Sequence, residues 1–354
     1  MKRFYGGLDV GSSVCELVVI NDEGLRVYAA KFSTSEHNLI VHVQEARKRC
    51  SGELHLALEE GEMAQWIAGI LRREVTRLVV CDPKRNHWIA RDPGKSDRVD
   101  AHKLAMLLKG EFVREVYHPE DQDRAEFKRV VQHYHDMTEN QADLKRQIKS
   151  KFRKYGIIPR GTRIFNSKSR EASLSMLPSE HSRQMVRQLF ELLDSAVKAQ
   201  KQAFKLMSPM GRSFPEVARF QEVPGIGPVW SCTFSAYIQT PQRFRNRRKL
   251  WKFCRLGVTN RQSNGEPLGY QRLDRNGVGM LKQLSYQAFC STMKGENEFR
   301  THYLQSLERT KDRTNARLST QRKILAVLYG MWKRNEPYRP FGRKEETEKN
   351  SARA

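Results

Sequence analysis

Four acidic residues near the start of the chain have the types and spacing of a divalent-metal site. Asp9 and Glu59 each come at the end of a short apolar run, and Asp97 and Asp100 lie three positions apart within residues 95–101. Carboxylate oxygens are the ligands that Mg²⁺ and Mn²⁺ prefer. Two such ions can hold the attacking and leaving oxygens of an in-line phosphoryl displacement. The four residues therefore predict a Mg²⁺ (or Mn²⁺) site that acts on phosphate esters.

The apolar periodicity predicts the elements that would position these carboxylates. Three β-branched-rich runs predict an antiparallel meander, and alternating helical and extended patterns then predict a mixed sheet with crossover helices. The strands are expected at residues 4–10, 14–21, a third ending near 32, 55–58 and 77–81, and the helices at 36–49, 63–73 and 96–109. Asp9 and Glu59 would then lie at strand ends, where open α/β sheets place their chemistry. Asp97 and Asp100 would share one face of a helix.

Simpler roles compete with the metal site. Asp97 could be an N-cap, with Asp100 completing a carboxylate version of the capping box near the helix dipole. Glu60 and Glu62 compete with Glu59 for the second ligand position. The order of the four residues on this strand and helix pattern favours the metal site. Glu59 is preferred because it directly follows the apolar strand.

Charge divides the chain into two unequal parts. Residues 1–125 carry 19 Lys and Arg against 20 Asp and Glu, whereas the whole chain carries 64 against 40, a formal net charge of +24. The entire excess of positive charge therefore lies after residue 125. A basic region of this kind, in a chain with a pI near 10, favours a polyanionic partner, and nucleic acid is the class expected.

Cysteine usage and hydropathy bear on the cellular compartment in which the protein is expected. The six cysteines are scattered, without a Cys-x-x-Cys pair, so neither a zinc site nor a disulfide framework is expected. No apolar run approaches the roughly 20 residues of a membrane-spanning helix. The first three residues lead into a strand instead of a signal peptide. We therefore expect no membrane partner and a location inside the cell.

Two apolar stripes with spacings of three and four predict a central coiled coil over residues 126–210. The first stripe, apolar at six of its eight positions, is Phe127, Val130, Tyr134, Met137, Gln141, Leu144, Ile148 and Lys151. The second is Met185, Leu189, Leu192, Ala196, Ala199, Ala203 and Leu206. The two stripes could pack on each other as a hairpin or on another subunit. Residues 155–178 between them are expected to form a basic loop, either a solvated connector or a nucleic-acid contact. His133 and His135 lie among polar residues and are expected to be exposed.

The third region, residues 211–333, is predicted to be mostly helical and basic. Gly225 and Gly227 in the run 223–228 favour a helix-hairpin-helix-like element, because paired glycines at a helix start let backbone N–H groups approach a phosphate. A plain turn before a buried helix is the alternative. A cationic run with interleaved aromatics follows and suits phosphate contacts through Arg245, Arg247, Arg248 and Lys249. Residues 334–354 are expected to form a disordered charged tail.

Ser263 lies in a polar run, residues 259–269. Spacing alone fixes no His or Lys base beside it, so the residues by themselves give only weak grounds to treat it as a nucleophile. The same stretch is too rich in Asn, Gly and Pro to be mostly helix or strand.

Taken together, these segments resemble the DEDD-type transposases of the insertion sequence 110 family. The resemblance rests on residues 7–11, 57–61, 80–84, 95–101, 223–228 and 263–265. It implies an N-terminal RuvC-like domain of the RNase H fold over residues 1–125, a coiled coil over 126–210, and a C-terminal transposase domain over 211–333 that supplies a serine nucleophile.

Carried over by position, the resemblance implies roles for five residues. Asp9, Glu59, Asp97 and Asp100 would bind Mg²⁺, and Ser263 would attack the phosphodiester to form a covalent link to DNA. The implied partners are donor and target DNA, a structured non-coding guide RNA, and further copies of the chain in a dimer or tetramer. The implied place of action is the bacterial cytoplasm, at the nucleoid. A structure-specific metal-dependent nuclease and a non-catalytic nucleic-acid-binding protein are the alternatives.

Overall fold

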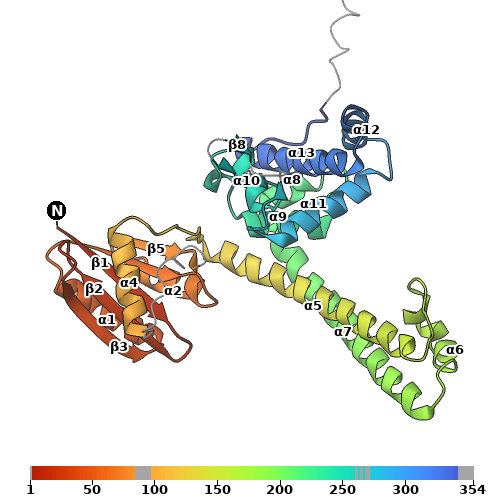
Figure 1. Cartoon of the computed structure of the whole chain (residues 1–354), viewed down its shortest axis with the longest axis horizontal. Coiled ribbons are helices and arrows are strands. Elements are labelled where there is room, and N and C mark those ends of the chain that lie inside the picture. The colour runs from red at the N-terminus through yellow and green to blue at the C-terminus, as the bar shows by residue number, and fades with distance from the viewer. Residues whose placement is uncertain (1, 84–96, 260–261, 264–265, 268–271, 342–354) are drawn as a thin grey trace, which may run out of the picture. The chain divides into compact units, whose positions relative to one another are not determined.

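The structure is a computed structural model that describes residues 2–83, 97–259, 262–263, 266–267 and 272–341. The chain divides into two compact units, Met1–Ala125 and Glu126–Ala354. Figure 1 shows the elements of both units. Each unit has its own hydrophobic clusters and is described by itself.

The first unit is built on a five-stranded mixed sheet with the order β3-β2-β1-β4-β5. The strands are β1 (Arg3–Val10), β2 (Val14–Ile20), β3 (Arg26–Ser33), β4 (Glu53–Glu59) and β5 (Arg77–Cys81). The first three strands form an antiparallel meander, and β1, β4 and β5 run parallel. The mixed sheet predicted from the periodicity is thus confirmed, with the two parallel crossovers made by helices.

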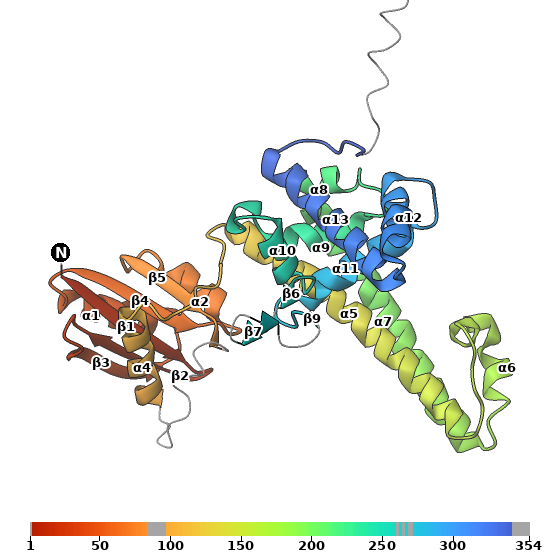
Figure 2. The same ribbon diagram turned by 45° about the horizontal axis from the view of Figure 1, so that its top comes forward.

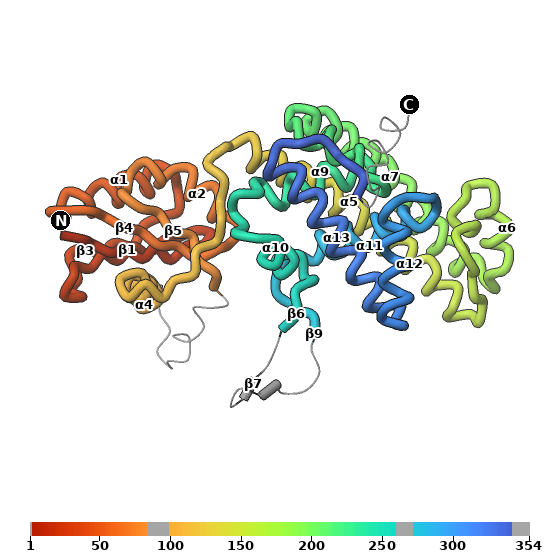
Figure 3. Tube along the Cα trace, turned by 90° about the horizontal axis from the view of Figure 1, so that it is seen from above, coloured from red at the N-terminus to blue at the C-terminus, as the bar shows by residue number. Residues whose placement is uncertain are grey.

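Helices cover both faces of this sheet. The helices α1 (Glu36–Lys48) and α2 (Ala64–Leu71) lie on one face, and α4 (Asp97–Lys109) lies on the other (Figure 3). Alternate strand residues point to opposite faces, and the two clusters follow that rule. Leu56 and Leu58 of β4 join the cluster under α1 and α2, whereas Ala57 packs with Leu104 of α4. The sheet is therefore buried on both sides, which explains its continuous apolar strands.

Two long antiparallel helices dominate the start of the second unit. The helices α5 (Gln122–Arg153) and α7 (Glu180–Arg212) lie side by side in both views (Figure 1, Figure 2). Phe127, Tyr134 and Ile148 from the predicted stripe of α5 are buried. The first of the two predicted arrangements, a hairpin of the two helices within one chain, is the one that the structure contains.

The buried face of α7 overlaps only in part with the predicted stripe. Ala203 of that stripe is buried and Leu189 packs on the core, but Met185, Leu192 and Leu206 are 41%, 55% and 61% exposed. Next to these three, Val186, Leu193 and Met207 are buried instead. A heptad pattern gives a period, but it does not say which of two neighbouring stripes meets a given partner.

The expectation that His135 is exposed is wrong. His135 is 9% exposed, and its Nε2 lies 2.8 Å from the Thr233 hydroxyl of α9 (Pro228–Ile238). That hydroxyl donates its own proton to the Val229 carbonyl at 2.7 Å, so Nε2 of His135 must be the donor. Burial lowers the pKa of His135 to about 4. A neutral histidine thus connects α5 to α9.

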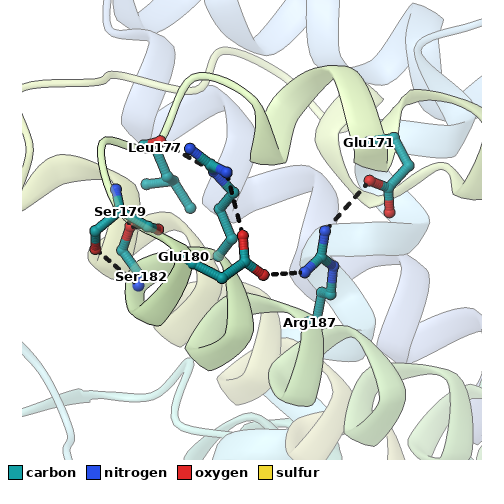
Figure 4. A network of polar contacts seen from close by, with 7 residues as sticks. Glu171, Leu177, Ser179, Glu180, Ser182 and Arg187 are labelled. Carbon is teal, nitrogen blue, oxygen red and sulfur yellow. Dashed lines mark hydrogen bonds and ion pairs between the residues drawn. The ribbon is translucent and has the colours of Figure 1, made fainter.

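The segment between α5 and α7 is a folded cap. It contains two 3-10 turns and a short helix, η1 (Arg163–Phe165), η2 (Ser167–Ser169) and α6 (Arg170–Leu174). Ser179 and Ser182 form a capping box at the start of α7. Arg187 donates to Glu180 at 2.7 Å and lies 3.7 Å from Glu171 (Figure 4). The basic loop expected here is therefore ordered, and one of its own cations, Arg170, donates to Asp194 at 2.6 Å.

The rest of the second unit is a helical bundle with short strand pairs. Its elements are α8 (Pro215–Phe220), α9, η3 (Pro241–Arg243), α10 (Arg247–Phe253), β6 (Val258–Thr259), β7 (Gln262–Ser263), β8 (Glu266–Pro267), β9 (Arg272–Leu273), α11 (Gly279–Thr292), α12 (Glu298–Thr310) and α13 (Arg313–Arg334). Tyr338 and Phe341 pack on its core, although the sequence placed them in a disordered tail. Residues 342–354 of that predicted tail lie outside the described residues. Over the described part of the chain, no helix is both long and apolar enough to cross a membrane.

Candidate active site and nucleic-acid interface

Asp9 and Glu59 come side by side at the ends of two neighbouring parallel strands. Leu8 of β1 pairs with Leu58 of β4, so the next residue on each strand is one of the two carboxylates. Asp9 is half-buried and Glu59 is exposed. The carboxyl ends of adjacent parallel strands meet at one edge of a sheet, so the two acidic side chains share that edge.

Strand alternation places both carboxylates on the face that α4 covers. Gly7 lies two residues before Asp9, and a Cβ built on Gly7 would point at the backbone of α4, 2.0 Å from the Ala101 carbonyl oxygen. Ala57 lies two residues before Glu59 and packs with α4 in the same way. Residues two apart on a strand point to the same face, so Asp9 and Glu59 both face the side of the sheet where α4 lies.

The start of α4 lies toward the same edge. Gly24, in the turn between β2 and β3, lies beside Met106 and Lys109 near the end of α4. This turn is at the beginning of β1, because β1 and β2 are antiparallel. The helix thus runs opposite to β1, and its first turn, which holds Asp97 and Asp100, lies toward the strand end that carries Asp9.

The four positions therefore converge by backbone geometry. Asp100 is exposed, and the side chain of Asp97 lies outside the described residues. Among the side chains that the structure does describe, no three His, Cys, Asp or Glu residues form a group able to hold a metal ion. The donor set still fits a hard divalent cation, because every candidate ligand at this edge is a carboxylate.

Glu60 faces the other side of the sheet. It is next to Glu59, and its carboxylate is hydrogen-bonded to Nε2 of His118, whose Nδ1 lies 2.8 Å from the side-chain oxygen of Gln65 in α2. A residue held on the α2 side cannot also face α4. Of the glutamates that compete in the sequence, Glu59 has the position that matches Asp9, while Glu62 follows in an exposed turn.

Sequence reasoning missed one further carboxylate at this edge. Glu16 of β2 is paired in register with Asp9 and is 8% exposed. Val18 and Ile20, on the same face of β2, pack against α4. Glu16 is the one charged residue in an otherwise apolar strand, and that isolation was the signal available in the sequence. On the next strand, Lys31 stands opposite Glu16 in the register.

The second unit carries the predicted serine. Ser263 lies in β7, which pairs with β8 through Ser263 and Glu266. Its side chain lies outside the described residues. The segment that contains it leaves from β6 and returns through β9, which pair at Val258 and Leu273. The sequence favoured a loop here, and the structure adds these two-residue strands to it.

The two glycines of the predicted helix-hairpin-helix-like element have different surroundings. Gly225 has a φ of +86°, and a Cβ on it would lie 2.7 Å from the Ala288 carbonyl oxygen of α11. Gly227 is the N-cap of α9, and no atom of the described residues lies within 4 Å of an added Cβ. Gly225 is thus required by the turn and by close packing. Gly227 leaves the start of α9 open, with Pro228 at the first position.

The cationic run around α10 exposes its predicted contact residues, although the Arg247 guanidinium also lies 5.7 Å from the ring centroid of Trp251. Its four predicted contact residues are all exposed, namely Arg245, Arg247, Arg248 and Lys249. Asn246 caps α10 by accepting from two backbone N–H groups. Trp251 instead packs inward and donates its ring N–H to the Arg322 carbonyl at 3.0 Å. The cations are therefore placed for phosphates, while this aromatic residue is used for packing.

A mixed α/β unit with a carboxylate edge, joined to a basic helical unit, is the arrangement of an enzyme that acts on nucleic acid. Residues 6–157 match the family model of DEDD-type IS110 transposases, which is described as "Transposase". Residues 217–304 match a second model, "Transposase IS116/IS110/IS902 family". The search of curated proteins found no match. The two matches together cover more than half of the sequence, and the chain belongs to the IS110 family of transposases. It is accordingly a DNA transposase/recombinase.

Proposed function

We propose that this transposase cuts and rejoins DNA with an RNase H-like carboxylate site and a serine nucleophile. One observation carries the proposal: Asp9 and Glu59 are adjacent at the ends of β1 and β4 and face α4, whose first turn carries Asp97 and Asp100. The strand order β3-β2-β1-β4-β5 is consistent with an RNase H-like domain. The match to a DEDD-type family over the same unit supports the same reading.

The four carboxylates would hold the divalent ion, Mg²⁺ or Mn²⁺. When bound, such an ion supplies Lewis-acid stabilisation of charge on the phosphate oxygens. The protein contributes the positions: β1 and β4 fix Asp9 and Glu59 on a sheet buried on both faces, and α4 brings Asp97 and Asp100 toward the same edge. A site built on strands and a helix holds its ligands more rigidly than one built on loops.

In the proposed reaction, Ser263 Oγ attacks the phosphorus of a DNA strand. The new P–O bond to serine forms as the P–O bond to the leaving deoxyribose oxygen breaks, and the serine proton ends on that leaving hydroxyl. A hydroxyl of the incoming DNA end then attacks the same phosphorus, forms the new phosphodiester and returns Ser263 with its proton. The number of phosphodiester bonds is conserved, so no external energy source is needed. The match over residues 217–304 covers this segment.

The proposed partners are donor and target DNA, a structured non-coding guide RNA, and further copies of the chain. The second part of the sequence supports polyanion binding, because it carries all of the net charge of +24. The exposed cations around α10 are proposed as one contact surface, and the open start of α9 at Gly227 as another. The work is proposed to take place in the bacterial cytoplasm, at the nucleoid.

The proposal is tested by trapping the covalent intermediate. Purified protein, Mg²⁺, the flanking non-coding RNA and labelled element-end DNA are mixed, and a denaturing gel is read for DNA attached to protein. We expect an attached species that is absent for Ser263→Ala and for Asp9→Asn. Glu60→Gln is the matched control, since Glu60 is held by His118 on the other face, and it should retain the attached species.

Three outcomes contradict parts of the proposal. Free cleaved DNA without attached protein would favour the water-activating nuclease. Attachment that persists in Ser263→Ala would remove that serine as the nucleophile. If Asp9→Asn forms as much product as the wild type, the carboxylate site is not needed for the reaction and that part of the proposal is wrong.

A further inference from the structure

A basic cavity of about 670 Å³ lies in the second unit, beside the stem from which the Ser263 segment emerges. It is lined by residues of β9, the start of α11, the first half of α13, and Arg255 just after α10. Neither the predicted contacts nor the carboxylate site uses it. Its volume falls in the range of about 300–1,000 Å³ that is typical of ligand pockets.

The described lining of this cavity is strongly cationic. Arg255, Arg275, Lys282 and Arg317 come from separate turns of the chain, and the carboxylate among the described lining residues is Asp274. That carboxylate is already engaged, because it lies 3.4 Å from Lys252 Nζ and accepts from the Asn276 N–H at 2.9 Å. The net charge facing the cavity is therefore positive, which favours an anionic ligand.

One of these cations is fixed in place. Arg255 has a left-handed φ of +55° and donates from Nε to the Gly277 carbonyl at 2.7 Å. This bond holds the outer end of its guanidinium beside Gly279, the first residue of α11, whose N-cap has no side-chain hydrogen bond. The first N–H groups of a helix have no partner within the helix. A guanidinium fixed next to such a helix start suits a phosphate.

The cavity also has an aromatic wall. Tyr286 is 42% exposed, and the guanidinium of Arg317 lies 5.6 Å from its ring centroid. Among the described residues, Nε of Arg317 has no hydrogen-bond partner, so the position of this guanidinium is set by its packing on the ring. Tyrosine rings and guanidinium planes are the surfaces on which unpaired bases stack.

We propose that this cavity binds one unpaired nucleotide, with the phosphate at Arg255 and Lys282 and the base against Tyr286 and Arg317. The proposal rests on the proposed function in one respect, that the substrate or guide supplies a single-stranded segment. Single-stranded DNA and single-stranded RNA share the required chemistry. A duplex does not, because its bases are stacked on each other and not available to the ring.

The test uses the full chain and fluorescence anisotropy with three labelled probes: a single-stranded DNA, a single-stranded RNA and a blunt DNA duplex. Base stacking on an aromatic side chain contributes about 1–3 kcal/mol, which corresponds to about 5- to 150-fold in affinity. We expect Tyr286→Ala to lower the affinity for at least one single-stranded probe by that factor and the affinity for the duplex by less than about twofold. The single-stranded probe that loses affinity shows whether the bound nucleotide is DNA or RNA. Tyr286→Phe keeps the ring and should keep the affinity.

Phe112→Ala is the matched control and should keep the affinity for all three probes, because Phe112 is an exposed aromatic residue (78%) of the first unit, outside the basic part of the chain. A second readout uses 2-aminopurine in the single strand. Its fluorescence should be quenched by the wild type and by Tyr286→Phe, and not by Tyr286→Ala. Equal affinity of all variants for both single strands, or equal loss for single strands and duplex, would overturn the nucleotide site.

The outcomes separate this inference from the proposed function. Covalent attachment to DNA together with unchanged single-strand binding by Tyr286→Ala would overturn the nucleotide site and keep the serine reaction. Selective loss of single-strand binding without any covalent attachment would support the nucleotide site and remove the serine reaction.

Discussion

The substitution Gly7→Ala tests whether the carboxylate edge depends on the seating of α4. The added Cβ would lie 2.0 Å from the Ala101 carbonyl oxygen and 2.7 Å from the Ala105 backbone nitrogen, and ordinary van der Waals contact begins at 3.4 Å. Relief therefore requires α4 to recede by about 1.4 Å, the difference between 3.4 and 2.0 Å. No side-chain rotation can remove the clash, because the opposing atoms are backbone.

The size of the effect follows from this displacement. Overpacking of a filled site lowers the free energy of unfolding by about 1–3 kcal/mol. Replacing glycine by alanine raises it by about 0.4–1 kcal/mol, because the unfolded chain loses conformational entropy. The net loss should be about 0–3 kcal/mol, which leaves the unit folded. The effect on the reaction should be larger, because α4 carries Asp97 and Asp100. A shift of about 1 Å at a reacting centre costs about 100-fold in rate.

The assay pairs thermal unfolding with a Mg²⁺ titration of covalent attachment to DNA. Gly7→Ala should lower the rate of attachment about 100-fold and raise the Mg²⁺ concentration needed for half of the maximal rate. Gly61→Ala is the matched control, since none of the described atoms lies within 4 Å of an added Cβ there, and it should react as the wild type does. If Gly7→Ala melts and reacts like Gly61→Ala, the placement of α4 against the carboxylate edge is refuted.

Three further predictions follow from the described contacts. Burial lowers the pKa of His135 from 6.5 to about 4, so between these pH values the folded protein binds fewer protons than the unfolded chain. The free energy of unfolding should therefore drop by up to about 3 kcal/mol as the pH falls from 6.5 to 4. Thermal melts at several pH values should show a weaker pH dependence for His135→Gln. Glu59→Gln should abolish covalent attachment at any Mg²⁺ concentration whereas Glu60→Gln retains it, and equal loss in both would reject the assignment by strand face. Gly225→Ala should lower the free energy of unfolding by about 1–3 kcal/mol, and with it the melting temperature, because the added Cβ is strained and overlaps α11. Gly227→Ala should have a free energy of unfolding within about 0.5 kcal/mol of the wild type.

The sheet was predictable from the sequence because local patterns determine it. Each strand of the first unit is an apolar run bounded by turn residues, and burial on both faces makes those runs continuous. Asp9 and Glu59 could be placed at strand ends for the same reason. The sequence alone could not decide whether Glu59 or Glu60 faces α4. That choice depends on the strand register, because a shift of one residue moves a side chain to the opposite face of the sheet.

The features that sequence reasoning missed depend on distant partners. His135 was expected to be exposed because its neighbours are polar, yet the hydroxyl that it contacts belongs to Thr233, 98 residues away. On α7, Met185 and Val186 belong to adjacent apolar stripes, and only the packing of α5 decides that Val186 is the buried one. The basic cavity combines residues from 255 to 321, and no local spacing brings Arg255 next to α11.

The folded cap between α5 and α7 changes what the net charge of the chain means. Arg170 makes two hydrogen bonds of 2.6 Å to Asp194, and Arg183 and Arg187 both donate to Glu180. Each of these guanidinium groups already has a carboxylate partner, so it is less able to neutralise a DNA phosphate and release the cations condensed there. The affinity for nucleic acid falls with salt in proportion to the phosphates that the protein actually neutralises, with a logarithmic slope of about 0.9 for each contact on duplex DNA. A salt titration of DNA binding should thus count far fewer contacts than the formal charge of +24, because paired cations such as Arg170 should contribute little to that slope.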